Sequence, residues 1–128
     1  MAKTYKISLP QYGNDEIDFV IGKSVDDCIK SHKILSKSEL PSTMGGEGMT
    51  VTMSDGKRMA LAILIATDAN DVERNIVHEC FHATTVMIEF FSLPNSAENS
   101  EPGAYLMDSL YNECMIRYEK YLKTKKNV

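Results

Sequence analysis

The sequence predicts an α+β domain in which a small antiparallel sheet carries a short helix and two long C-terminal helices. Three observations lead to this class: strand-like alternation in the first half, an Asp55-Gly56 hairpin signal, and two long helical segments after residue 70. The 128 residues suffice for one compact domain, residues 1–128. Strands followed by helices favour a sheet with its helices packed on one face.

The first half of the chain contains strands and one short helix. Residues 3–9 and 16–22 alternate as half-buried strands do and flank a polar turn at residues 13–15. Residues 24–35 begin with Ser24 and carry a carboxylate three residues on, which predicts a capped short helix.

A glycine-rich segment and a hairpin follow. Residues 41–48 have neither the Lys-Ser/Thr pair nor the helix that a phosphate-binding loop needs, so this segment is predicted to be a flexible connection, with a flap beside a site as the alternative. Residues 49–54 and 57–65 are strand-like and are joined by the Asp-Gly turn.

Two long helices complete the prediction. Asn70, with Glu73 three residues later, is the expected cap of a helix of about 20 residues that ends before Pro94. Residues 100–102, Ser-Glu-Pro, are expected to open a final helix reaching about residue 123, because proline is favoured in a first turn.

Composition and charge exclude several classes of protein. With 43% hydrophobic and 25% charged residues, the chain is typical of a globular protein. A formal net charge of -4 argues against nucleic-acid binding, and the basic tail, residues 120–128, is expected to be a solvated and partly frayed helix end. The three cysteines form no CxxC pair and no apolar run approaches a membrane span, so we expect a cytoplasmic protein without membrane contact.

The strongest chemical signal is His78-Glu79-Cys80-Phe81-His82. Two histidines four residues apart lie one above the other on a helix, so both imidazoles can bind one Zn²⁺ ion. Glu79 is turned away from that face by about a quarter circle and can act as general base on a water held at the ion. Cys80 points away from the histidines and is predicted to belong to the core.

A catalytic zinc site needs a third protein ligand. Glu98 and Glu101 follow His82 by 16 and 19 residues, and Glu101 is favoured because it opens a helix expected to pack against the motif helix. Glu101 is also a first-turn carboxylate of the kind that the helix dipole favours without any metal. On the same face of that helix, Asp108 is a candidate for orienting a ligand histidine.

The remaining residues of the motif helix indicate its setting. Apolar side chains are spread around nearly its whole circumference, which predicts a central rather than a surface helix. We therefore expect the histidines to lie on a narrow polar stripe and to need a shared partner.

Together these residues resemble the zincin metallopeptidases. "HECFH" followed by a helix start "EPGAY" is similar to the gluzincin branch, and to small zinc peptidases encoded by bacteriophages, over residues 57–112. The resemblance implies His78, His82 and Glu101 as zinc ligands and Glu79 as the base. It further implies that an edge strand, here residues 59–65, pairs with an extended peptide or protein substrate.

The resemblance has departures that leave alternatives open. Tyr105 stands four residues after Glu101, where thermolysin-like enzymes carry an aspartate, and only Tyr105 and His32 are candidates for stabilising an oxyanion. The leading hypothesis is a zinc-dependent metallohydrolase, a peptidase, acting in the host cytoplasm if phage-encoded. The alternatives are a binding or inhibitory protein with a structural zinc site, and a helical adaptor without metal.

Overall fold

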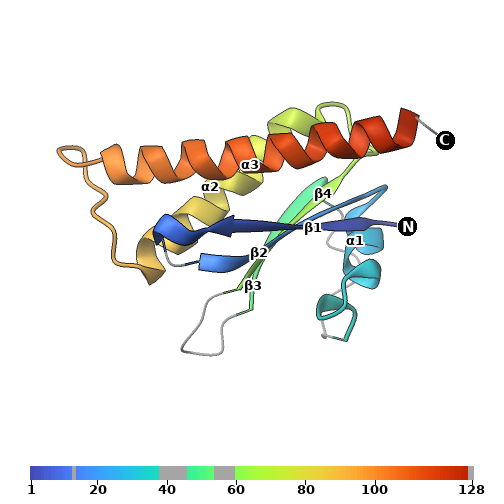
Figure 1. The fold of residues 1–128 in the computed structure, drawn as a ribbon, viewed down its shortest axis with the longest axis horizontal. Coiled ribbons are helices and arrows are strands. Elements are labelled where there is room, and N and C mark those ends of the chain that lie inside the picture. The colour runs from blue at the N-terminus through green and yellow to red at the C-terminus, as the bar shows by residue number, and fades with distance from the viewer. Residues whose placement is uncertain (13, 38–45, 54–59, 127–128) are drawn as a thin grey trace.

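The computed structural model describes residues 1–12, 14–37, 46–53 and 60–126. The fold consists of four strands, three α-helices and two short 3-10 turns, arranged as a sheet with helices on both of its faces (Figure 1). In chain order the elements are β1 Lys3–Leu9, η1 Pro10–Tyr12, β2 Asn14–Gly22, α1 Val25–Ser31, η2 Leu35–Lys37, β3 Gly48–Thr52, β4 Leu61–Ala66, α2 Val72–Phe90 and α3 Glu101–Lys126. The predicted α+β class, with one short helix and two long C-terminal helices, is confirmed.

The strands form one sheet in the order β1-β2-β4-β3. β1 pairs with β2, and β3 with β4, both antiparallel as a hairpin requires. β2 and β4, however, run parallel, with Phe19 opposite Ile63. The sheet is therefore mixed rather than wholly antiparallel, because the connection from β2 to β4 contains α1 and β3 and crosses from one end of the sheet to the other. The predicted Asp55-Gly56 turn lies outside the described residues.

The helices divide between the two faces of the sheet, and not onto one face as expected. α2 and α3 cover one face and α1 covers the other (Figure 1). β4 accounts for this arrangement, because all six of its residues are buried and they point alternately to the two helical layers. A strand that is apolar at every position is typical of a sheet covered on both faces.

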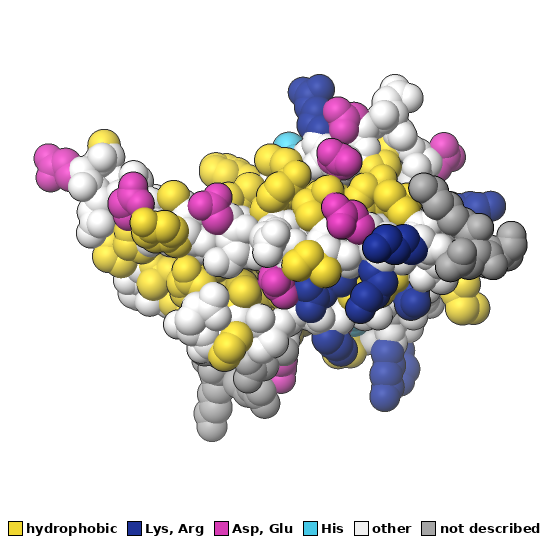
Figure 2. Space-filling model, turned by 45° about the horizontal axis from the view of Figure 1, so that its top comes forward, with side chains coloured by type: hydrophobic (Ala, Val, Ile, Leu, Met, Phe, Trp, Pro, Cys, Tyr) yellow, Lys and Arg dark blue, Asp and Glu magenta, His cyan; other side chains and the backbone are white. Residues whose placement is uncertain are grey.

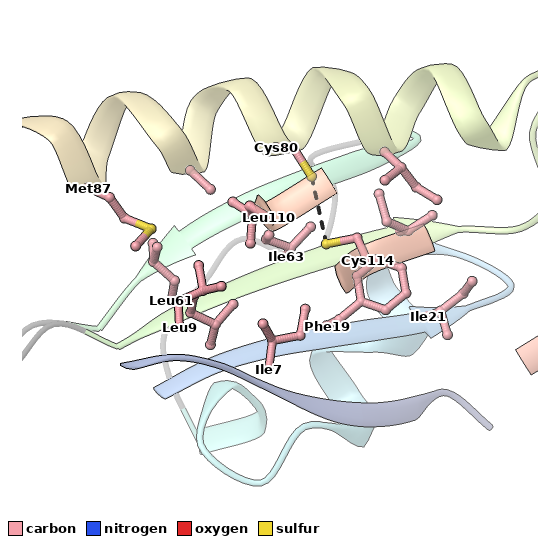
Figure 3. Packing of buried hydrophobic residues seen from close by; sticks show 14 of the residues in the cluster. Ile7, Leu9, Phe19, Ile21, Leu61, Ile63, Cys80, Met87, Leu110 and Cys114 are labelled. Atoms are coloured by element: carbon pink, nitrogen blue, oxygen red, sulfur yellow. Dashed lines mark hydrogen bonds between the residues drawn. The ribbon is translucent and has the colours of Figure 1, made fainter. Parts of the chain in front are cut away.

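The larger core lies between the sheet and the two long helices (Figure 3). Its sheet side is formed by side chains at alternate positions, among them Phe19 and Ile63, and its helix side by residues such as Met87 and Leu110. All four of these side chains are fully buried. The second core is smaller and joins Val20 and its neighbours to α1.

The helix ends follow from local hydrogen bonds. Ser24 caps α1, as predicted, by accepting a hydrogen bond from the backbone N–H of Asp27 at 3.0 Å. α2 is capped by Asp71, whose carboxylate accepts from the backbone N–H of Arg74 at 3.0 Å, and not by Asn70. Both residue types serve as caps, so neighbouring Asn and Asp residues leave the sequence signal ambiguous by one position.

α2 and α3 pack against each other through one side of each helix. The Cys80 thiol lies 3.7 Å from the Cys114 thiol, and Thr84 donates a hydrogen bond to the sulfur of Met107 at 3.4 Å. One turn further on, the Ile88 side chain lies against Gly103. The residues of α2 that contact α3 thus recur at every fourth position.

The three cysteines belong to the core, as predicted for Cys80. All are free thiols and fully buried. Burial raises the pKa of Cys28 to about 12, and the hydrogen bond with Cys80 together with burial raises the pKa of Cys114. Because metals bind the thiolate form, the raised pKa values of Cys28 and Cys114 make these two buried thiols poorly suited to be ligands.

None of the helices in the described part of the chain is both long enough and apolar enough to span a bilayer.

Candidate metal site

His78 and His82 come together on the exposed surface of α2. Their Nε2 atoms are 3.1 Å apart, and their rings meet edge to face with centroids 4.8 Å apart. Two imidazoles bound to one tetrahedral zinc at about 2.05 Å would hold their nitrogens about 3.3 Å apart. The observed separation therefore suits two ligands of a single ion, and this donor geometry fits zinc.

Glu79 lies beside the pair but is buried. Its side chain is 7% exposed, whereas that of His78 is 66% exposed. The hydroxyl of Thr50, on β3, lies 2.9 Å from Glu79 Oε1 and 3.1 Å from the Glu79 carbonyl oxygen, and so holds the carboxylate against the sheet. Glu79 Oε2 is 4.0 Å from His78 Nε2, too far for a direct hydrogen bond and near enough for one small ligand to touch both.

The close approach of β3 to Glu79 depends on Gly48. A Cβ atom at this position would lie 2.9 Å from Glu79 Cγ and 3.1 Å from Glu79 Oε2. Glycine thus allows the strand to lie directly on the side chain of the proposed base.

Substitution of Gly48 by alanine is expected to destabilise the protein by about 1–3 kcal/mol, because the new methyl group overpacks against Glu79. Urea unfolding measures this loss. Thr52→Ala, on the exposed part of the same strand, is the control and should change the free energy of unfolding by less than about 0.5 kcal/mol. Equal stability of Gly48→Ala and the unmodified protein would show that the strand does not press on Glu79.

A cavity of about 490 Å³ opens beside these residues. It lies between α2 and β3, with both histidines and Glu79 on one wall and Gly48, Thr50 and other residues of the strand on the opposite wall. The two imidazoles therefore face a cleft whose far side is the backbone of a strand.

The strand beside the site is β3 and not residues 59–65, as the resemblance implied. β4 lies inside the sheet between β2 and β3, so both of its edges are already paired. β3 pairs with β4 along one edge and is the last strand of the sheet. β3 is thus the edge strand on this side of the sheet.

Glu101 is not brought to the histidines. α3 packs on the side of α2 that carries residues 80, 84 and 88, and His82 is two residues, or about 200°, from each neighbouring member of that set. The histidines therefore point away from α3. No group of three or more His, Cys, Asp or Glu side chains suited to a metal occurs among the described residues.

The other predicted residues of α3 follow the same geometry. Tyr105 is 61% exposed and Asp108 is also exposed, and neither lines the cavity beside the histidines. Glu98 is exposed in the loop between the two helices. The structure thus places Tyr105 and Asp108 on a helix that covers another side of α2, and Glu98 outside that helix.

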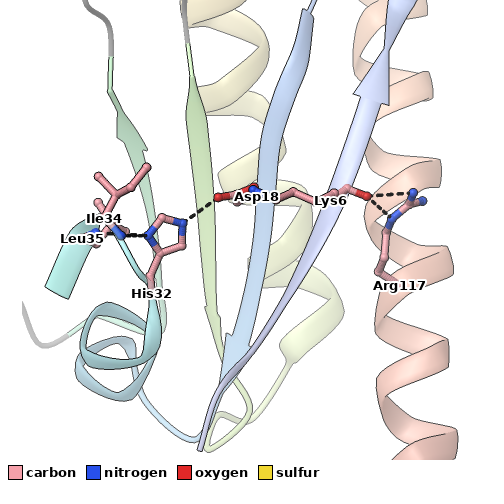
Figure 4. Close-up of polar contacts among 6 residues, drawn as sticks. All are labelled: Lys6, Asp18, His32, Ile34, Leu35 and Arg117. Atoms are coloured by element: carbon pink, nitrogen blue, oxygen red, sulfur yellow. Dashed lines mark hydrogen bonds and ion pairs between the residues drawn. The ribbon is translucent and has the colours of Figure 1, made fainter.

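His32 lies at the end of α1, which covers the other face of the sheet from α2, and Figure 4 shows its contacts. Its Nε2 is 2.6 Å from Asp18 Oδ2, and its Nδ1 accepts the backbone N–H groups of Ile34 and Leu35 at 3.2 and 3.1 Å. The acceptor role of Nδ1 assigns the ring proton to Nε2, which donates to Asp18. Both ring nitrogens are engaged, so His32 anchors the turn after α1 and is not the oxyanion donor considered from the sequence.

The Asp18 carboxylate also links this cluster to the helical layer (Figure 4). Lys6 Nζ lies 2.6 Å from Asp18 Oδ1, and the guanidinium of Arg117 on α3 donates to the carbonyl oxygen of Lys6. The buried carboxylate is thereby paired with a cation and with an imidazole N–H.

α2 is less buried than its composition predicted. Val77 is 42% and Phe81 63% exposed, although the apolar circumference of the helix predicts a central position. Figure 2 shows further hydrophobic side chains on the outer surface of the two long helices. α2 is therefore covered on two sides, by the sheet and by α3. Its remaining side is an exposed strip that carries both apolar and polar side chains.

Four residues of the site gave no recognisable signal in the sequence: Glu47, Gly48, Thr50 and Asn75. Three of them precede the motif by 28 to 31 positions in the chain and reach it only through the pairing of β3. A threonine in a strand-like run and a glycine at the end of a glycine-rich segment are too common to indicate a site.

A scan against protein-family models, a search of curated proteins and a search of solved structures each found no match to this chain.

Proposed function

We propose that this protein is a zinc-dependent hydrolase that cleaves peptides, with His78 and His82 as metal ligands and Glu79 as general base. One observation carries the proposal. Two imidazole nitrogens meet at 3.1 Å in a cleft, directly beside a buried carboxylate that a neighbouring strand holds in place.

Each of these residues would have its own role in the hydrolysis. A zinc ion held by the two imidazoles would supply a Lewis acid that polarises a carbonyl and acidifies a water molecule. Glu79 would accept a proton from the attacking water and later deliver it to the leaving amine. Thr50 and Gly48 keep the carboxylate of Glu79 in one position, so that it need not be ordered during the reaction.

A peptide in extended conformation is the substrate class that the cleft favours. β3 is the last strand of the sheet and its residues line the cavity, and an extended chain can add to an edge strand through backbone hydrogen bonds. Strand addition would place one peptide carbonyl of the added chain over the histidines. Recognition would then depend on the backbone more than on particular side chains.

Glu79→Gln tests the proposed chemistry. The variant should retain zinc but lose about 10²–10⁴-fold in peptide cleavage, because an amide cannot accept the proton of the water. The zinc-loaded protein would be incubated with a peptide library and the products identified by mass spectrometry. Glu89→Gln, an exposed glutamate of the same helix, is the matched control and should cleave normally. Cleavage that persists unchanged in Glu79→Gln would contradict the role of Glu79.

A second candidate is a binding protein whose zinc site is structural. The exposure of Val77 and Phe81 next to the histidines favours it, since exposed apolar residues beside a site suit a protein partner. A structural site would need a fourth protein ligand in place of water. The same experiment separates the two, because a structural site predicts zinc binding without cleavage in the unmodified protein.

A further inference from the structure

We propose that Glu47 is the third protein ligand of the zinc site, supplied by the segment that enters β3. This inference rests on the proposed function, because it takes His78 and His82 as the other two ligands. It places the third ligand upstream of the histidines on the sheet side of the cleft, and not downstream on α3.

The backbone of Glu47 is fixed beside the site. Its carbonyl oxygen accepts a hydrogen bond from the backbone N–H of Ala66 at 3.0 Å. The next residue, Gly48, pairs with Ile65 and lies directly on Glu79. Glu47 is therefore held at the end of the β3–β4 pair, where the strand meets α2.

The side chain of Glu47 extends toward the histidine helix. Asn75 Nδ2, on α2, donates a hydrogen bond to Glu47 Oε2 at 2.9 Å. Asn75 precedes His78 by three residues and so lies on the same side of the helix, one turn earlier. This contact brings the carboxylate to the helix surface that carries the ligands.

A second cavity connects these groups. It has a volume of about 450 Å³ and is lined by Gly46, Glu47, Gly48, Asn75, His78 and Glu79. Three of these residues, Gly48, His78 and Glu79, also line the cavity between α2 and β3. Glu47 and His78 therefore line the same cavity, and His82 lines the neighbouring one.

The chemistry of the carboxylate suits the role. Zinc accepts a carboxylate oxygen at about 2.0–2.2 Å beside two imidazole nitrogens, and such a ligand is normally hydrogen-bonded by a neighbouring group. Asn75 would serve as that neighbour by binding Oε2 while Oε1 turns to the ion. Glu47 is exposed, so packing does not fix its carboxylate in the one conformation that binds Asn75.

Zinc titration tests the inference. Affinity is measured by competition with a chromophoric chelator for the unmodified protein and for Glu47→Gln, Glu101→Gln and Glu73→Gln. Gln at position 47 retains an acceptor for Asn75, so the fold is preserved while the charged ligand is removed. Glu73, exposed in the first turn of α2, controls for the loss of one negative charge from the same helix.

We expect Glu47→Gln to weaken zinc binding by more than the roughly 10–100-fold that follows loss of an outer hydrogen-bonding partner. Glu101→Gln and Glu73→Gln should leave the affinity unchanged. With Co²⁺ in place of zinc, the visible absorption of Glu47→Gln should also change, because that absorption reports the ligands and their geometry.

Four outcomes would overturn the inference. Normal affinity and an unchanged Co²⁺ spectrum in Glu47→Gln would place the third ligand elsewhere and leave the proposed function standing. A large loss in Glu101→Gln would move the ligand to α3. Half an equivalent of zinc per chain would mean that two copies share the ion, and no zinc in the unmodified protein would contradict the proposed function as well.

Discussion

Replacing either His78 or His82 with alanine is expected to abolish zinc binding by this protein. The two imidazoles are the only pair of metal-binding nitrogens that the described part of the chain holds within 3.1 Å of each other. One remaining imidazole and a carboxylate cannot provide the three protein ligands of a catalytic site. The affinity for zinc should therefore fall by well over roughly 100-fold, which is the largest loss expected when only a hydrogen-bonding partner of a ligand is removed. Calorimetric or competitive titration measures this change.

Thr85→Ala is the matched control for the histidine variants. Thr85 lines the same cavity, one turn from His82, but its hydroxyl donates to the carbonyl oxygen of Phe81 within the helix. Its loss should leave zinc binding intact. Since both histidines are exposed, their variants should remain folded by circular dichroism. Normal zinc affinity in a folded His78→Ala variant would exclude the proposed site.

Phe19→Ala is expected to lower the free energy of unfolding by about 3–5 kcal/mol, the usual range for a fully buried phenylalanine. Phe19 is fully buried in the centre of β2, where it faces the two long helices (Figure 3). Its removal leaves a cavity between the sheet and the α2–α3 layer that rigid neighbours cannot fill. Urea unfolding monitored by circular dichroism measures the effect.

Phe81→Ala is the control for this prediction. It removes the same side chain from the exposed surface of α2, so the free energy of unfolding should change by less than about 0.5 kcal/mol. A loss below about 1 kcal/mol for Phe19→Ala would mean that the layer of long helices does not seal this face of the sheet.

Much of the fold was predictable because it depends on local signals. The serine cap of α1, the length of α2 and the start of α3 at Glu101 follow from residues within a few positions of each boundary. The parallel pairing of β2 with β4 was not predictable in this way. The connection between these two strands contains α1, which covers Ala62 and Leu64 on the second face of the sheet. In the sequence, this second covered face was indicated by the continuous apolar strand.

The candidate site also has one part that could be predicted from the sequence and one part that could not. Because His78 and His82 are four residues apart on one helix, their side chains lie close together, and this feature could be predicted from the sequence. The partners of that pair depend on the rotation of α2 about its own axis. Contacts at Cys80 and Thr84 turn the histidines away from α3 and toward β3, and only tertiary packing decides this rotation.

Burial was the least predictable property of the motif helix. An apolar composition around the circumference does not distinguish a core position such as Ala83 from a surface position such as Phe81. Single exposed apolar residues are common in folded proteins, so the composition overstated how deeply the helix is buried.

X-ray absorption at the zinc edge of the untagged, zinc-loaded protein tests the central claim most directly. The account predicts about one zinc per chain, surrounded by nitrogen and oxygen atoms at about 2.0–2.1 Å and with the signature of two imidazoles. A sulfur shell at about 2.3 Å, or a protein that retains no zinc, would contradict it.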